Sequence, residues 1–326
     1  TRTFIRVREL SFFFESHTAH ASFEDAEAQI REDLDIWAHI GRKYALPALF
    51  NRRPDWDKFA GAHYTVGIDS YVSAPGRAMQ VASIHQYRDN FARVYDVTFE
   101  DERGERQYAH QTTYGISERI LGAVVAIHGD DRGVVFPPEI APIQVVIVPI
   151  LAKGSKRKLT QAAKSLQREI SAAARTELDL RDMRPGAKFY EWERKGVPLR
   201  VELGLKELEG EYVTLVQRDS GRRSKAKRAE AEKRIPALLA RIQRDLYRKA
   251  DRELQEGIHT IDAYEATPSG RIIRTGWCEK ESCGLAMEEK LGRPLLGTPY
   301  EPEEFQGRCL ECGDETDSVV YAANSY

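Results

Sequence analysis

The stretch Pro142-Ile143-Gln144-Val145-Val146-Ile147-Val148-Pro149-Ile150 marks the point at which the hydrophobic pattern of this chain changes. Residues 145–150 form a continuous apolar run, which is typical of a strand buried on both faces. Downstream, strand-like and helix-like segments alternate up to about residue 252, and this alternation indicates an α/β sandwich. We expect helices over 158–175, between Pro185 and Gly196, and from about Lys225, with strands at 178–180, 199–203 and 212–217.

The residues before this stretch show a different pattern. Ser22 followed by Asp25 is typical of a helix N-cap, and apolar residues recur at helical spacing from Phe23 to Trp37, up to a limit at Pro47. Strand-like runs follow at 65–72, 79–83, 92–100 and 107–114, and residues 117–127 resemble a buried helix. Strands joined by such short turns predict an antiparallel sheet.

Length and composition exclude several classes of protein. A chain of 326 residues with 41% apolar and 31% charged residues suits two or three globular domains, not a disordered, collagenous or disulfide-stapled protein. We expect no membrane association, because no run of eighteen apolar residues occurs. No Walker-type phosphate loop or dinucleotide-binding glycine fingerprint is found. Four cysteines are too few for a secreted scaffold, so we expect a reducing, cytoplasmic location.

Charge is distributed very unevenly along the chain. Residues 152–252 carry 27 Lys and Arg against 15 Asp and Glu, whereas residues 1–151 carry 16 against 21, and residues 253–326 carry 6 against 15. A basic middle between acidic ends indicates a domain that meets a polyanion such as nucleic acid. The alternative is a solvated basic helical face.

The four cysteines form two closely spaced pairs. Four residues separate Cys278 from Cys283, two separate Cys309 from Cys312, and 25 lie between the pairs. This spacing predicts a tetrahedral zinc site, with Gly284 and Gly313 allowing sharp turns beside the ligands. Such a closed four-thiolate site would be structural, because it leaves no open coordination position. The alternative is four reduced cysteines without a metal.

Several longer stretches of sequence follow one another in a characteristic order along the chain. They occupy residues 4–9, 15–21, 58–61, 80–85, 115–138 with His128-Gly129-Asp130 inside it, 142–150 and 192–200, followed by the four cysteines and the terminal Tyr326. In order and spacing these stretches resemble the prolyl-tRNA synthetases of the archaeal and eukaryotic type, a family of class II aminoacyl-tRNA synthetases. The resemblance covers essentially the whole chain and implies a proline–tRNA ligase.

The resemblance also implies a division into domains. Residues 1–140 would be the later part of a class II catalytic domain with an antiparallel sheet, from the second strand of motif 2 to motif 3. Residues 141–252 would form an α/β anticodon-binding domain, and residues 253–326 a small zinc-binding α+β domain. The expected fold class is therefore α+β at both ends of the sequence and α/β in between.

The implied reaction joins proline and ATP into prolyl-adenylate and then transfers the prolyl group to the 3′ end of tRNA(Pro). Cations must neutralise phosphate charge in the transition state, and the resemblance assigns this catalytic role to Arg6 and Arg119, with Mg²⁺ sharing the charge. The implied ATP-binding residues are Arg6, Val7, Gln80, Ser83, Ser117 and Arg119. Proline would contact Glu15, His17 and His85. The alternative interpretation is that these side chains have only a structural role.

The basic middle segment resembles the anticodon-binding domain shared by several class II synthetases. The positions that read the anticodon guanines correspond to Glu193, Arg200 and Lys206. A carboxylate accepts hydrogen bonds from guanine N1 and N2, whereas Arg and Lys donate to O6 and N7. The structural alternative is that Glu193 and Arg200 pair with each other.

The chain also departs from the family pattern. Tyr87, Arg88 and Asp89 precede Asn90 where small or apolar residues and glutamine are usual, and Glu118 replaces a small hydroxyl residue. Motif 1, the proline-reading Thr-x-Glu and the motif 2 arginine for the α-phosphate are not in this sequence, so we expect further residues before Thr1. Since class II enzymes dimerise through motif 1, we expect a homodimer.

Two other functions remain open at this point. One is a non-catalytic, synthetase-derived protein that binds tRNA or regulates another enzyme. The other is a class II synthetase for threonine, histidine or glycine, because these enzymes share the anticodon-binding domain type.

Overall fold

The computed structural model describes residues 12–151 and 154–326, which form two compact units. The first unit contains the described residues up to Arg42, together with Leu46–Ala123 and Asp251–Tyr326. The second contains Lys43–Ala45 and Val124–Ala250. The two ends of the sequence therefore share one unit, and the basic middle forms the other.

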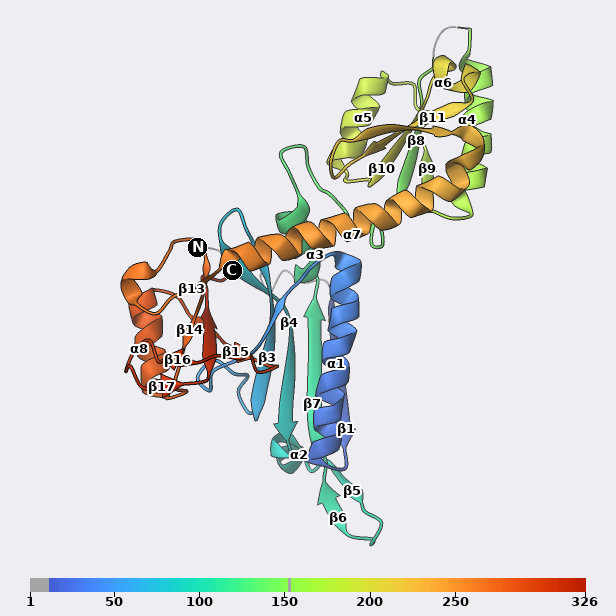
Figure 1. The fold of residues 1–326 in the computed structure, drawn as a ribbon. Helices are drawn as coiled ribbons and strands as arrows, with labels where there is room; N and C mark the ends of the chain where they lie inside the picture. The colour runs from blue at the N-terminus through green and yellow to red at the C-terminus, as the bar shows by residue number, and fades with distance from the viewer. Residues whose placement is uncertain (1–11, 152–153) are drawn as a thin grey trace. The chain divides into compact units, whose positions relative to one another are not determined.

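The described residues of the first unit are built on a nine-stranded sheet (Figure 1). Its strands follow the order β1 (Phe13–His20), β7 (His110–Ser117), β4 (Arg77–Arg88), β3 (Tyr64–Val72), β2 (Leu49–Arg52), β15 (Leu295–Pro299), β18 (Val319–Ala322), β14 (Ile272–Gly276) and β13 (Ile258–Thr260). Neighbouring strands are antiparallel except β13 and β14. Because β15 pairs with β2, strands from the two ends of the sequence join in one sheet.

Helix α1 (Phe23–Tyr44) covers one face of this sheet, and Figure 1 shows it alongside β1, β4 and β7. The expected N-cap is present, since Ser22 Oγ accepts a hydrogen bond from the Asp25 amide at 3.1 Å. Glu27 Oε1 accepts hydrogen bonds from Tyr64 of β3 at 2.8 Å and from Gln86 of β4 at 2.9 Å. These contacts identify the α1 face of the sheet, and the candidate site residues lie on the other face.

Smaller elements complete the first unit. They are α2 (Asn90–Tyr95), the hairpin β5 (Thr98–Glu100) and β6 (Arg106–Tyr108), α3 (Arg119–His128), whose last turns belong to the second unit, η3 (Tyr264–Ala266), α8 (Glu281–Leu291) and the hairpin β16 (Gly307–Arg308) and β17 (Glu315–Thr316). Helix α8 packs Cys283, Met287 and Leu291 into a core with Leu295 and Val320. This core ties the cysteine-containing segment to the nine-stranded sheet.

The second unit contains a five-stranded sheet. Its order is β12 (Arg223–Lys227), β11 (Tyr212–Gln217), β10 (Leu199–Leu203), β8 (Val145–Pro149) and β9 (Thr176–Leu178). Strands β9, β8 and β10 are parallel, whereas β11 and β12 are antiparallel to their neighbours. Its helices are α4 (Lys156–Ser171), α5 (Pro185–Arg194), α6 (Leu205–Glu209), η2 (Arg228–Glu230) and α7 (Ala231–Gly257), whose last turns belong to the first unit.

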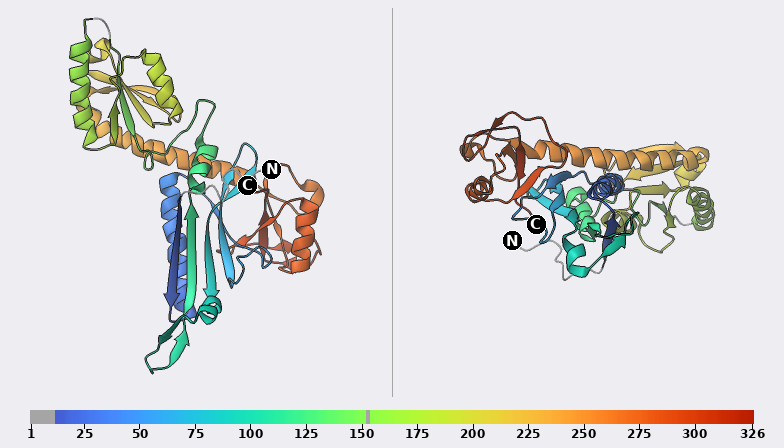
Figure 2. Two further views of the ribbon diagram at one scale, coloured as in Figure 1. Left: turned by 180° about the vertical axis from the view of Figure 1, so that it is seen from behind. Right: turned by 90° about the horizontal axis from the view of Figure 1, so that it is seen from below.

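Helices cover both faces of the five-stranded sheet, as Figure 2 shows from behind. Leu159 and Leu166 of α4 and Ile235 of α7 pack with Val145 and Ile147 on one face. Trp192 and Phe189 of α5 pack with Val146 and Val148 on the other. The mixed architecture expected from the sequence, antiparallel in the outer parts and α/β in the middle, is confirmed. None of the helices within 12–151 and 154–326 is long and apolar enough to cross a bilayer.

Three local predictions were wrong. Residues 92–100 do not form one strand, because α2 continues to Tyr95 and Asp96 then adopts a left-handed turn (φ 54°) before β5. The long helix predicted from about Lys225 is present as α7 but begins only at Ala231, because Lys225–Lys227 belong to strand β12, where Ala226 is buried and its two neighbours are exposed, a period of two. The strand predicted at 178–180 lies at Thr176–Leu178, where it pairs with β8.

Asp33 of α1 gives a test of this packing. Its carboxyl is buried, and burial raises its pKa to about 6 from an ordinary value near 3.9. Since the folded state disfavours the charged form, the stability that Asp33 contributes is lost as the pH rises through about 6. We expect Asp33→Asn to raise the free energy of unfolding by about 2–3 kcal/mol at pH 7.5 and to leave it unchanged at pH 3.5. Thermal melting at both pH values, with exposed Asp35→Asn as the control, checks this; equal gains at both would contradict it.

Candidate functional site

Strand register gathers the predicted proline-site residues on the sheet face opposite α1. Glu15 of β1 pairs with Gly115 of β7, which pairs with Ser83 of β4. In the next row, His17 pairs with Thr113, which pairs with His85. Directly paired residues in an antiparallel sheet project from the same face. Segments 15–17 and 83–85, separated by more than sixty residues in sequence, therefore form one surface.

Glu15 and His17 form the solvent-exposed end of this surface. The His17 Nε2 and Glu15 Oε2 atoms are 3.2 Å apart, and the His17 side chain is 67% exposed. Thr113 Oγ1 lies 3.3 Å from His17 Nδ1. Glu15 therefore offers a carboxylate at a position that a ligand can reach.

His85 lies deeper and is held on both sides. Its Nδ1 is 2.9 Å from Thr65 Oγ1, its Nε2 is 3.1 Å from Ser83 Oγ, and the Phe59 ring lies 4.8 Å from the imidazole. Burial lowers the pKa of His85 to about 4, so that the ring is neutral at pH 7. One nitrogen of the ring donates and the other accepts, which fixes how the Ser83 hydroxyl is oriented.

Gln80 reaches the same face through an irregularity in β4. Ser83 pairs with Gly67 and Ala82 with Ile68, but the next residue to pair is Gln80, with Asp69. The skipped Val81 is a β-bulge, and it shifts the alternation of the strand by one residue. Without the bulge, Gln80 and Ser83 would project from opposite faces, since three positions separate them.

Two of the residues predicted to contact ATP, Ser117 and Arg119, lie where β7 ends and α3 begins. Ser117 Oγ accepts a hydrogen bond from the Arg119 amide at 3.3 Å. The Arg119 guanidinium donates through Nη1 to the Gln80 carbonyl at 3.4 Å, so its side chain is directed over β4. Arg6 and Val7, the other predicted ATP contacts, lie outside the described residues.

The residues that depart from the family pattern have ordinary structural contacts. Tyr87 stacks against His85 with ring centroids 6.0 Å apart, and the Arg88 guanidinium lies over the Phe23 ring at 5.0 Å. Asp89 forms an ion pair with Arg93 at 2.6 Å. Glu118 accepts a hydrogen bond from the Phe12 amide at 3.0 Å.

The four cysteines converge in the first unit. The sulfur atoms of Cys278, Cys283, Cys309 and Cys312 all lie within 4.8 Å of one another, and those of Cys278 and Cys312 are 3.7 Å apart. Sulfurs bound to tetrahedral zinc at about 2.3 Å are roughly 3.8 Å apart, so this donor set fits the ion. Gly313 adopts the expected left-handed turn (φ 75°), but Gly284 lies within α8, where its missing side chain makes room for Trp56.

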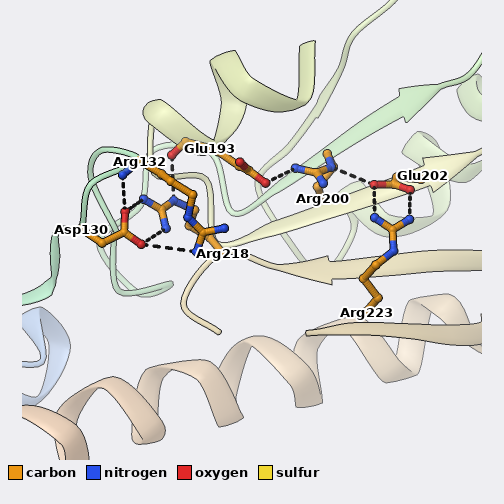
Figure 3. Close-up of polar contacts among 7 residues, drawn as sticks. All are labelled: Asp130, Arg132, Glu193, Arg200, Glu202, Arg218 and Arg223. Atoms are coloured by element: carbon orange, nitrogen blue, oxygen red, sulfur yellow. Dashed lines mark hydrogen bonds and ion pairs between the residues drawn. The ribbon is translucent and has the colours of Figure 1, made fainter. Parts of the chain in front are cut away.

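In the second unit, Glu193 and Arg200 belong to a network of charged side chains (Figure 3). Arg200 is only 7% exposed; Nη1 donates to Glu193 Oε1 and Nε to Glu202 Oε1, both at 3.1 Å. Its guanidinium also lies over the Phe189 ring at 4.2 Å. Arg223 donates to both carboxylate oxygens of Glu202, so that Glu202 Oε1 accepts from Arg200 and Arg223 together. The pairing of Glu193 with Arg200, considered above as the structural alternative, is thus present in this structure.

Lys206 is not part of this network. It lies on α6, which follows the far end of β10, and its side chain is exposed. Among the described residues it makes no hydrogen bond or ion pair with Glu193 or Arg200. The three predicted anticodon contacts therefore occupy two separate places on the second unit.

Two residues that the sequence reasoning did not select complete the network. Arg218 donates to both carboxylate oxygens of Asp130 (2.6 and 2.8 Å), to the Gly133 carbonyl at 3.0 Å and to the Glu193 carbonyl at 2.8 Å. These bonds hold the pKa of Asp130 well below its ordinary value. The string His128-Gly129-Asp130 was the only sequence signal, and it did not identify a partner 88 residues away.

Comparison with known proteins finds two families that each match a part of the chain. Residues 144–238 match the family described as Anticodon binding domain, and residues 262–326 match Prolyl-tRNA synthetase, C-terminal. Proline--tRNA ligase of Pyrococcus horikoshii is 46% identical over 336 residues, covering all of this chain and 70% of the relative. The enzymes of the same name from Methanosarcina mazei and Methanopyrus kandleri are 44% and 42% identical, covering all of this chain and 69% and 68% of theirs.

These relatives are each more than 40% identical over an alignment that covers the whole chain, and the second matched family is described as specific to prolyl-tRNA synthetases. A class II synthetase for threonine, histidine or glycine would share the anticodon-binding domain but not this C-terminal domain. The chain belongs to the proline–tRNA ligase family.

Proposed function

We propose that this chain activates proline with ATP and takes part in transferring the prolyl group to tRNA(Pro). The observation that carries the proposal is the strand register that brings Glu15, Ser83 and His85 onto one sheet face, away from α1. Glu15 would pair with the ring ammonium of proline, and His17 lies beside that carboxylate. The neutral His85, held by Thr65 and Ser83, would form part of the wall of the pocket.

ATP would bind next to this pocket. Arg119 would contact the distal phosphates, with Gln80, Ser83 and Ser117 forming the floor beneath them. By resemblance, Arg6 would contact the phosphates and the Val7 backbone the adenine. Mg²⁺ would share the phosphate charge, and cations in these places stabilise the charge that develops at the α-phosphate.

The second unit would bind the anticodon loop of tRNA(Pro). Glu193 and Arg200 have the donor and acceptor groups that distinguish guanine, and Lys206 would contact the RNA from α6. Because Arg200 is engaged by two carboxylates, guanine would have to replace at least its bond to Glu193. The 27 basic residues of segment 152–252 would attract the RNA phosphates.

The four cysteines would hold one structural Zn²⁺, since their sulfurs are spaced as a tetrahedral site requires. By resemblance to class II enzymes, we propose a homodimer, and four cysteines that form no disulfide suit a reducing, cytoplasmic location. Light scattering after size-exclusion chromatography tests the oligomeric state.

Pyrophosphate exchange in the full-length protein tests the proposed activity. Exchange of labelled pyrophosphate into ATP should require proline and should not respond to threonine, histidine or glycine. Charging of tRNA(Pro) should then follow with the same enzyme. Absence of proline-dependent exchange in a protein that still binds tRNA(Pro) would favour the non-catalytic alternative.

Arg200→Ala separates recognition of tRNA from amino-acid activation. Losing a good base contact costs about 1–3 kcal/mol of binding free energy. We therefore expect kcat/KM for charging of tRNA(Pro) to fall by the corresponding factor, while the rate of pyrophosphate exchange is unchanged. Arg223→Ala is the matched control, because Arg223 shares the Glu202 carboxylate but has no predicted base contact. Equal losses in both half-reactions, or equal effects of both variants, would show that Arg200 is only structural.

A further inference from the structure

Arg53 lies immediately after β2 and is almost completely buried, with a side-chain exposure of 6%. Its guanidinium crosses the face of the sheet that carries the candidate site. A Cβ atom on Gly67 would come within 2.3 Å of Arg53 Nη2, so only glycine leaves room for it. A buried cation in such a dedicated space requires partners for its charge and for its donors.

The guanidinium of Arg53 connects three segments that are distant in sequence. Nη2 donates to Asp69 Oδ1 of β3 at 2.9 Å, and Asp69 is itself only 2% exposed. The same nitrogen donates to Gln80 Oε1 of β4 at 3.1 Å. Nη1 donates to the carbonyl of Leu296 in β15 at 2.7 Å. One planar group therefore links the C-terminal segment to the floor of the ATP site.

The contact with Gln80 determines which end of its amide remains available. Because Oε1 accepts from Arg53, the Nε2 group, with its two N–H donors, points away from the guanidinium. Within the described residues Nε2 makes no hydrogen bond. Gln80 therefore presents donors, and not an acceptor, on the face where the candidate site lies.

We propose that Arg53 is a positioning residue for amino-acid activation: it fixes the Gln80 side chain so that Nε2 donates to an acceptor atom of ATP or proline. This inference rests on the proposed function, in which Gln80 contacts substrate. The Leu296 carbonyl holds the other arm of the guanidinium, so β15 of the C-terminal segment takes part in placing Gln80. Asp69 neutralises the buried charge and keeps the guanidinium flat against Gly67.

Arg53→Lys tests this role without removing the charge that Asp69 requires. A guanidinium is planar and its N–H donors point in fixed directions, whereas a lysine ammonium is a point charge. Lysine therefore cannot donate to Asp69, Gln80 and Leu296 at the same time with this geometry. We expect kcat/KM for proline-dependent pyrophosphate exchange to fall by roughly 10-fold, as for loss of a hydrogen bond to a charged group. Arg52→Lys is the matched control, because Arg52 is exposed and lies over the Tyr64 ring; it should leave exchange within about twofold.

A double-mutant cycle with Gln80→Ala distinguishes positioning from general structural support. If Arg53 acts through Gln80, then Arg53→Lys combined with Gln80→Ala should be no slower than Gln80→Ala alone, within about twofold. Multiplied losses in the double variant would overturn the inference while leaving the proposed function intact. Unchanged exchange in Gln80→Ala alone would instead overturn the substrate contact assigned to Gln80 in the proposed function, and this inference with it.

Gln80→Glu provides a third readout that a purely structural role would not affect. Glutamate keeps an oxygen for Arg53 and the shape of the side chain, but it has no N–H to donate. We expect a melting temperature at least equal to that of the unsubstituted protein, together with a loss of exchange as large as in Gln80→Ala. Full exchange activity in Gln80→Glu would show that the Nε2 donors are not used.

Discussion

Arg119→Ala should suppress proline-dependent pyrophosphate exchange by about 10²–10³-fold, the usual cost of removing a transition-state contact to developing charge. Arg119 is the first residue of α3, and its guanidinium lies against the Gln80 carbonyl, beside the proposed phosphate site. Its positive charge would be needed while pyrophosphate departs. Exchange kinetics at saturating proline, with ATP varied, measure the effect directly.

The control variant must show that the effect comes from the position of Arg119 and not simply from removing one positive charge from the protein. Arg103 lies in the exposed turn between β5 and β6, and Arg103→Ala should leave exchange unchanged. Binding of tRNA(Pro) should be nearly the same in both variants, since the anticodon contacts are assigned to the second unit. Normal exchange by Arg119→Ala would show that this arginine forms only structural contacts.

Cys309→Ser should have the largest effect on stability. Elemental analysis should find about one zinc per chain in the unsubstituted protein and much less in the variant, because a structural zinc site contributes its binding free energy to folding. Cys309 is 2% exposed and belongs to the same core as Leu295 and Val320, so loss of the metal should loosen β15 and β18 as well. We therefore expect the melting temperature of the first unit to fall.

The second unit should keep its structure in Cys309→Ser, because its core is formed by β8, β10, α4 and α5. Retained binding of tRNA(Pro) would report this. Ser282→Ala, at an exposed position beside Cys283, is the matched control and should keep both the zinc and the melting temperature. A metal-free protein with unchanged melting would refute the zinc site.

Local patterns predicted much of this molecule because the forces behind them act over a few residues. The apolar run at 145–150, the N-cap at Ser22 and the alternation of helices and strands reflect hydrogen bonding and burial within single elements. The two cysteine pairs required only short spacings to predict a common site, and their sulfurs do converge. The family itself was evident from the order of motifs along the chain.

Local patterns failed where a residue's role depends on a partner elsewhere in the chain. The bulge at Val81 reverses the alternation of β4, and only pairing with β3 shows that Gln80 and Ser83 share a face. The β12 segment has a highly charged sequence that suits a helix, but pairing with β11 makes it an edge strand.

The sequence by itself determined the family, most of the secondary structure and the residue types of the candidate sites. Only the tertiary structure decided which of those residues meet: Arg218 joins Asp130 across 88 positions, and Arg53 joins Leu296 across 243. The reason is that a buried guanidinium must satisfy its charge and donors with whatever acceptors the folded sheets bring near. That requirement depends on strand order and register, which no local period in the sequence encodes.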